Sequence, residues 1–280
     1  MLTALLSAAT AALFGSGDFL GGLASRRSPA LAVTGVVYAV GAVTFAALLL
    51  AVRPDALTRA DLLWGTASGV AGTVGILALY AALAIGRMSI VAPITAALSG
   101  GGPALFDLAR GSRVGPVTLA GLALALVAVV IVSTTTGTVE EHGMPPRAVG
   151  LSVLAGLSFA GSLVSLSLTA PASGFAPLLI ARAVGTAIML VAIVVRRREM
   201  ALDRSGFRMA AGAGLLDAAA NITMISAIRI GPLAVAAVVG SLYPVATMLL
   251  ARWVLGERLK RHQALGVALA LAAVVLTALP

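Results

Sequence analysis

The chain has 280 residues, of which 60% are hydrophobic and only 10% are charged. Soluble domains are about 45–50% apolar and about 25% charged, so this composition argues strongly against a soluble globular enzyme, whose surface would lack polar cover. It excludes intrinsic disorder on the same grounds. The mean hydropathy of +1.08 agrees with both exclusions. Because cysteine is absent, disulfides, thiolate metal sites and a cysteine nucleophile are excluded as well.

The net charge is +9, from 19 Lys and Arg residues against 10 Asp and Glu residues. In a soluble protein this balance would suggest nucleic acid as a partner. Here the basic residues lie in short gaps between apolar runs, which is typical of the flanks of membrane spans. Aromatic residues make up only 4% of the chain, which argues against platforms for stacking bases. The expected partner is therefore the lipid bilayer and not nucleic acid.

Ten apolar runs approach the roughly 20 residues that a transmembrane helix needs. Their continuous apolarity, without two-residue alternation, favours helices over a transmembrane barrel. We keep the first run as a mature helix, because it is too long for the apolar region of a signal peptide. The sequence thus predicts an all-α integral membrane protein with ten transmembrane helices, at about 2–24, 30–52, 62–84, 88–108, 114–134, 148–170, 175–195, 208–228, 231–251 and 262–279.

A polar gap at about 135–147 divides the runs into five and five. A shift of 145 residues aligns the two sets over a long stretch, so that Gly111 falls on Gly256 and Arg113 on Arg258. Because five is odd, the second copy must enter the membrane in the opposite sense. Inverted repeats around a midplane site are a recurrent architecture of secondary transporters. The predicted organisation is a first five-helix repeat at 1–136, a polar linker at 137–147 and a second repeat at 148–280.

Three short motifs lie in and around the ninth run, within residues 225–279. Gly231-Pro232 opens the span, Ser241-Leu242-Tyr243-Pro244 lies inside it, and Leu255-Gly256-Glu257-Arg258-Leu259 closes it. With the five-plus-five arrangement, these motifs resemble the EamA family of the drug/metabolite transporter superfamily. The resemblance implies a ten-helix carrier in the cell membrane that works by alternating access and usually exports small metabolites, amino acids or drugs.

The first copy departs from the pattern of this family. Gly111-Ser112-Arg113 lacks the acidic residue that Glu257 supplies in the second copy, and Ala97-Leu98-Ser99 stands where the Leu-Tyr-Pro element is expected. The resemblance covers nearly the whole chain and is most specific at its C-terminal end. Since the family is broad, the resemblance does not identify the substrate.

Ionisable side chains within spans are costly, by about 2.5–3.5 kcal/mol on insertion scales, and are therefore functional candidates. Arg182 lies in the seventh run and Asp217 in the eighth, with Asn221 one helical turn further along the same face. In a central cavity, Arg182 would hold a substrate carboxylate, and Asp217 would balance charge or carry a coupling proton. The alternative is a structural ion pair between adjacent helices, with Asn221 making an interhelical hydrogen bond.

Several further polar residues allow two interpretations. Asp18 in the first run is either a second acidic site or a group near the lipid headgroups, and Asp107 and Arg252 are expected at the membrane interface. Three tyrosines within spans either line the path or belong to the core: Tyr38, Tyr80 and Tyr243.

Helix-breaking residues form a second group of candidates, for gating. Pro93 lies inside the fourth run and Pro244 inside the ninth, which are corresponding spans of the two copies. Proline removes a backbone hydrogen bond and kinks a helix, and interrupted spans at corresponding positions point to a transporter site. The alternative is a packing kink. The fourth run also carries Gly100, Gly101, Gly102 and Pro103.

The sequence favours a secondary active transporter that moves a small metabolite (an amino acid, amine or drug-like compound), in the direction of efflux, with a proton or counter-substrate as the coupling partner. The alternatives are a non-transporting membrane sensor or scaffold and, less favoured, a membrane-embedded enzyme.

The chain has no phosphate-binding Gly-x-x-x-x-Gly-Lys-Ser/Thr motif. Neither His142 nor His262 has an acidic partner at metal-ligand spacing, so no cofactor or metal is expected. The oligomeric state, monomer or homodimer, is left open.

The charges in the gaps bear on the orientation in the membrane. The gaps after spans 1, 3, 5, 7 and 9 hold 13 Lys and Arg residues, and those after spans 2, 4 and 8 hold 5. The positive-inside rule then predicts both termini outside the cytoplasm, whereas the resemblance favours both inside. We expect a multi-pass protein of the plasma or inner membrane.

Overall fold

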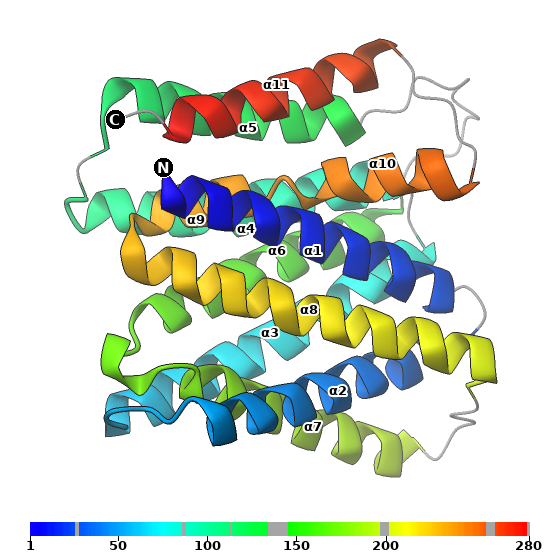
Figure 1. Ribbon diagram of the computed structural model, residues 1–280. Coiled ribbons are helices and arrows are strands. Elements are labelled where there is room, and N and C mark those ends of the chain that lie inside the picture. The colour runs from blue at the N-terminus through cyan, green and yellow to red at the C-terminus, as the bar shows by residue number, and fades with distance from the viewer. Residues whose placement is uncertain are drawn as a thin grey trace.

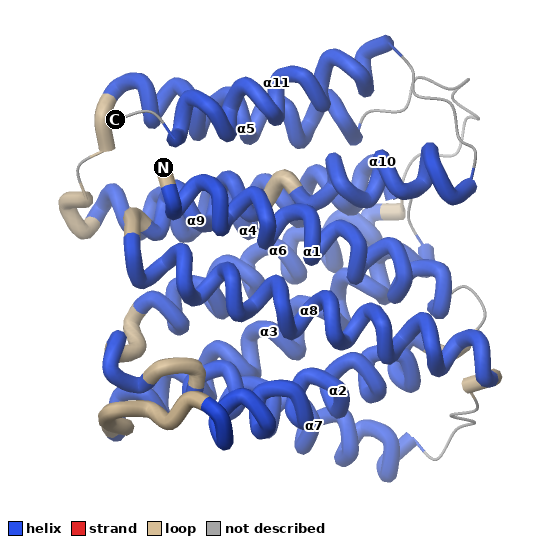
Figure 2. The backbone as a smooth tube through the Cα atoms, viewed as in Figure 1, coloured by secondary structure: helices blue, strands red, loops and turns tan. Residues whose placement is uncertain are grey.

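The structure is a computed structural model that describes residues 1–25, 28–85, 88–112, 114–133, 145–196, 202–255 and 261–278. All regular secondary structure within these ranges is helical (Figures 1 and 2). The elements are α1 (Leu2–Ser25), α2 (Ala30–Ala51), α3 (Arg59–Ile85), α4 (Met88–Ala109), α5 (Pro116–Ser133), α6 (Pro146–Ser167), the 3₁₀ turn η1 (Pro171–Ser173), α7 (Ala176–Arg196), α8 (Arg204–Ile230), α9 (Leu233–Gly240), α10 (Tyr243–Leu255) and α11 (Arg261–Ala278).

Within the described ranges, six helices are long and apolar enough to cross a membrane: α1, α2, α3, α6, α7 and α8. Shorter apolar segments lie in α5, across α9 and α10, and in α11. The all-helical membrane class is therefore confirmed, while the count of ten spans and their inverted arrangement stay predictions. Most of the predicted linker, and residues 256–259 of the closing motif, lie outside the described residues.

The helix boundaries follow the 145-residue offset found in the sequence. α3 and α8 are offset by that number at both ends, and so are α5 and α11. The packing follows the same correspondence, because α1 packs along α8 and its counterpart α6 packs along α3. α2 packs on α7, α4 on α9 and α5 on α11, so each of these pairs joins corresponding helices. The two halves thus contact each other through equivalent faces.

The helices lie in a bundle with α5 and α11 along one edge and α2 and α7 along the opposite edge (Figure 1). The remaining helices lie between these two pairs, and α1 begins at the same end of the bundle at which α11 ends. The core between them consists mostly of small apolar side chains, with Ala234, Val238 and Val239 of α9 among the most buried. Small residues let helices approach closely where lipid offers little driving force for association.

The fourth and ninth spans differ in a way that the sequence did not predict. α4 runs as one helix from Met88 to Ala109, through Pro93 and the three glycines, so the predicted interruption there is wrong. Pro93 lacks the N–H that would donate to the carbonyl oxygen of residue 89, in the first turn of α4. The loss of this one hydrogen bond near the start of the helix does not interrupt α4. The ninth span is divided at Ser241 and Leu242 into α9 and α10. Pro244 lies in the first turn of α10, where a missing N–H costs little.

The division between α9 and α10 lies against α1. A Cβ atom added to Gly15 of α1 would overlap the carbonyl oxygen of Tyr243 and lie 2.7 Å from Cβ of Ala246. The Thr247 hydroxyl donates a hydrogen bond of 3.0 Å to the Gly15 carbonyl oxygen. The missing side chain of Gly15 therefore lets α1 contact the backbone of the divided span.

We predict that Gly15→Ala lowers the thermal midpoint of the protein in detergent. The added methyl group must displace backbone, and such overpacking typically costs about 1–3 kcal/mol. Gly22→Ala in the same helix is the matched control, since a Cβ atom there would meet nothing within 4 Å; its higher helix propensity should leave the midpoint unchanged or raise it. Equal midpoints for the two variants, measured by size-exclusion after heating, would contradict this packing.

Candidate functional site

A cavity of about 140 Å³ lies inside the bundle and is bordered by residues from both halves of the chain. Among the described residues, α5 and α11 contribute none of its lining, and every other α-helix contributes at least one residue. Its polar lining consists of Asp18, Tyr38, Ser68, Ser99, Ser162, Arg182, Asp217, Asn221, Ser241 and Tyr243. Its apolar lining includes Phe14, Ile76, Leu79, Phe159, Leu163, Leu166, Leu178 and Met224. Six of the residues singled out from the sequence therefore meet in one place.

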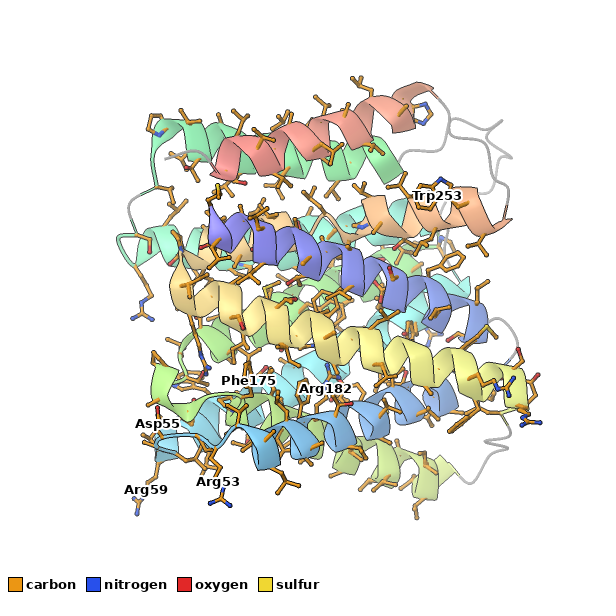
Figure 3. The ribbon with its side chains drawn as sticks, viewed as in Figure 1. Arg53, Asp55, Arg59, Phe175, Arg182 and Trp253 are labelled. Carbon is orange, nitrogen blue, oxygen red and sulfur yellow. The ribbon has the colours of Figure 1, made fainter. Side chains whose placement is uncertain are left out.

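Arg182 and Asp217 form an ion pair across the cavity wall, between α7 and α8. Arg182 Nη2 donates to Asp217 Oδ2, and the two side chains are only 10% and 18% exposed. Figure 3 shows Arg182 within the bundle, whereas Arg53 and Arg59 project at one of its ends. In a low-dielectric interior this attraction is strong, and removing one partner leaves an uncompensated charge.

The aromatic ring of Tyr38, on α2, packs against the Arg182 guanidinium group. The Arg182 guanidinium carbon lies 4.7 Å from the centroid of the Tyr38 ring, a geometry of cation–π attraction. The Thr73 hydroxyl donates to the Tyr38 hydroxyl oxygen at 3.3 Å. Gly185 of α7 leaves the space that the ring occupies, because a Cβ atom there would overlap Tyr38. Of the two interpretations of Tyr38, the structure thus favours a residue that lines the cavity, with its ring against Arg182.

Asn221 and Asp18 also reach the cavity, in different ways. Asn221 Nδ2 donates to the Asp217 carbonyl oxygen at 2.8 Å, so its hydrogen bond lies within α8 and does not join two helices as the structural alternative expected. Asp18, on α1, borders the same cavity as Asp217 on α8. Among the described residues it has no hydrogen-bond or ion-pair partner, and it lines the cavity. The structure thus places Asp18 at the cavity, together with the other acidic candidate, Asp217.

The other two tyrosines separate into a cavity residue and a core residue. Tyr243 lines the cavity, and its buried hydroxyl has no hydrogen-bond partner in the described part of the chain. Tyr80 packs in an apolar cluster with Leu79 and Val91 and, unlike Leu79, is not itself a cavity-lining residue. Its hydroxyl lies against Gly21 of α1. The core alternative thus describes the position of Tyr80.

Two of the three glycines of α4 are packing positions. A Cβ atom at Gly100 would come 2.8 Å from Cβ of Ser241, and one at Gly102 would come 2.9 Å from Cβ of Ala160, whereas Gly101 has open space. None of these glycines lines the cavity, and neither do Pro103 and Pro244. For Pro93 the structure describes only the helical backbone.

Two serines at the cavity were missed by the sequence analysis. Ser68 of α3 and Ser162 of α6 share a hydrogen bond of 2.8 Å between their hydroxyls, and both line the cavity. Serine is common in tightly packed membrane helices, so neither position stands out in the sequence. Only the pairing of α3 with α6, which the internal repeat does not specify, brings them together.

A polar cluster at one end of the bundle was also missed. Asp61 Oδ1 accepts a hydrogen bond of 2.7 Å from the Ala170 backbone nitrogen, and Oδ2 accepts from Thr58. Arg229 Nη2 donates to the Ala170 carbonyl oxygen at 3.5 Å and to the Ser173 hydroxyl at 3.4 Å. Thr58 and Asp61, three residues apart before an apolar run, are a helix-capping signature that could have indicated the cluster.

Asp107 has a structural position at the same end. Its Oδ2 accepts a hydrogen bond of 2.9 Å from the Ala234 backbone nitrogen, in the first turn of α9. Its Oδ1 accepts from the Ser112 hydroxyl at 2.7 Å. The carboxylate thus satisfies an orphan N–H of α9. Within the described ranges, no three His, Asp or Glu side chains cluster as metal ligands would.

Comparison with known proteins gives a family match for the second half of the chain. Residues 146–279 match the model of the EamA-like transporter family. A solved structure described only as "Crystal structure of protein" has a TM-score of 0.75 at 17% sequence identity, over 98% of this chain and 95% of that chain, which shows a shared fold. None of the curated proteins is a significant match. The resemblance inferred from the sequence is therefore confirmed for residues 146–279, the part of the chain that matches the EamA-like transporter family of the drug/metabolite transporter superfamily.

Proposed function

We propose that this protein is a secondary active transporter that carries a small metabolite across the cell membrane, in the direction of efflux, by alternating access. The observation that carries the proposal is the cavity, in which side chains from both halves of the chain surround the Arg182–Asp217 ion pair. Charged groups at membrane depth are retained mainly where they serve substrates, ions or protons. The match of residues 146–279 to a transporter family agrees with this use.

The arrangement of the helices supports a mechanism in which the two halves rock against each other. Corresponding helices pack together across the bundle, as α2 with α7 and α4 with α9. Such contacts between equivalent faces are what two inverted five-helix repeats would make, and inverted repeats commonly alternate around a central site. The divided span, α9 and α10, lies on the cavity and offers the flexible element that a gate requires.

We predict that Arg182→Ala and Asp217→Asn each abolish flux and lower stability. Each variant leaves one buried charge without its partner, and breaking a buried pair typically costs about 3–5 kcal/mol. The double variant Arg182→Gln/Asp217→Asn carries neither charge, so it should regain most of the thermal midpoint and still fail to transport. The measurement is uptake into proteoliposomes, screened against pools of amino acids, amines, sugars and organic acids with and without a proton gradient.

The double variant separates the transport role from a structural one. If it regains both stability and flux, the ion pair is structural only and the assignment of these two residues is wrong. If the wild-type protein carries no member of any pool, the non-transporting sensor or scaffold becomes the better account.

We predict that Pro244→Ala slows transport several-fold without unfolding the protein. Alanine has the N–H that proline lacks and can donate it to the carbonyl oxygen of Gly240, which would join α9 to α10 as one stiffer helix. Pro116→Ala, at the first residue of α5 and away from the cavity, is the control and should transport at the wild-type rate. A wild-type rate for Pro244→Ala would exclude the divided span as a gate.

A further inference from the structure

The charges that line the cavity do not balance. Among the described lining residues, the charged groups are Asp18, Arg182 and Asp217. The ion pair neutralises Arg182 and Asp217 against each other, so Asp18 is left as a carboxylate without a partner. A carboxylate in a largely apolar cavity is costly unless a cation or a proton neutralises it.

We propose that the cavity binds a small organic cation, a protonated amine whose apolar part is about the size of one aromatic ring, with Asp18 as its counter-ion. This inference rests on the proposed transport function and names the substrate class for the same site.

The polar groups around Asp18 match an ammonium group. A primary ammonium has three N–H donors and no acceptor, and it needs oxygen atoms around it. Asp18 supplies a carboxylate, and Tyr243, which lines the same cavity, has a buried hydroxyl without a partner in the described part of the chain. The ammonium would therefore satisfy two groups that the other described residues leave unsatisfied.

The rest of the cavity suits an apolar body of limited size. Phe14, Phe159 and Met224 line it, and aromatic faces also attract cations. Its volume of about 140 Å³ is similar to that of an engineered apolar cavity of ~150 Å³ that binds benzene. A single aromatic ring or a branched alkyl group of that size fits this volume, and a larger drug-like molecule does not.

An anionic substrate fits this arrangement poorly. Arg182, the cation that could hold a carboxylate, is already paired with Asp217 and stacked on Tyr38. An added carboxylate would compete with Asp217 and be repelled by Asp18. The geometry therefore disfavours the direct contact between Arg182 and a substrate carboxylate that the sequence suggested.

The test is a calorimetric titration of the purified protein with four probes that each carry one phenyl ring: benzylamine, benzyl alcohol, benzoate and phenylalanine. Benzylamine should bind at least tenfold more tightly than the other three. Asp18→Asn, which keeps the shape of the side chain, should weaken benzylamine binding at least tenfold, and Asp18→Glu should restore part of it. Asp203→Asn is the control and should bind like the wild type, because Asp203 caps the start of α8 outside the cavity.

The thermal midpoint distinguishes a binding role from a structural one. Asp18→Asn removes an unpaired charge from the largely apolar cavity, so the thermal midpoint of this variant should equal or exceed that of the wild type. A sharp fall would give Asp18 a structural role and contradict the proposal. Absence of benzylamine binding, or tighter binding of benzoate or phenylalanine, would overturn it too. Flux of an anionic or neutral pool without amine binding refutes only this inference, whereas amine binding without flux of any pool supports the inference and refutes the transport function.

Discussion

One ion pair between α7 and α8 lies at the centre of the structure, because two opposite charges inside a membrane protein are least costly when they neutralise each other. Arg182 and Asp217 satisfy each other, and the Tyr38 ring covers the guanidinium from α2. Three helices are thereby fixed relative to one another at the level of the cavity. Alternating access requires these helices to move, so any large movement must either carry the pair as a unit or replace it with substrate contacts.

The second constraint is close helix packing at positions without side chains. Gly15 admits the backbone of the divided span, and Gly185 admits the Tyr38 ring. Gly100 admits Ser241, which lies at the division between α9 and α10. These contacts place the division directly on the cavity wall. A substrate that occupies the cavity would therefore touch the part of the bundle whose backbone is least regular, which is how binding could bias a gate.

Much of the fold could be predicted from the sequence, because the apolar runs and the 145-residue offset are strong signals. The offset recurs in the boundaries of α3 and α8. That Arg182, Asp217 and Asp18 meet at one site could also be predicted, since charged residues at membrane depth are rare and costly. Their pairing could not, because nothing in the spacing of two separate spans says which faces meet. For the same reason, the sequence could not predict that Ser68 and Ser162 meet at the cavity.

The helix breakers show where local rules fail. Proline and consecutive glycines weaken an isolated helix, yet α4 stays continuous, because neighbouring helices fill the space beside Gly100 and Gly102. Tertiary packing thus overrides propensity in α4. In the ninth span the break is at Ser241 and Leu242, before Pro244. The residue type alone could not distinguish these two outcomes.

The central claim, a cavity that opens to each side of the membrane in turn, can be tested with single cysteines, since the natural chain has none. The variant Ser162→Cys places a cysteine at the cavity. The control variant, Val43→Cys, replaces a side chain that is 71% exposed near the middle of α2 and is expected to face lipid. A membrane-impermeant thiol reagent would be added to one side of sealed vesicles or to the other. Alternating access predicts that Ser162→Cys reacts from both sides, that substrate slows both reactions, and that Val43→Cys reacts from neither. Reaction at position 162 from one side only, with or without substrate, would contradict the account.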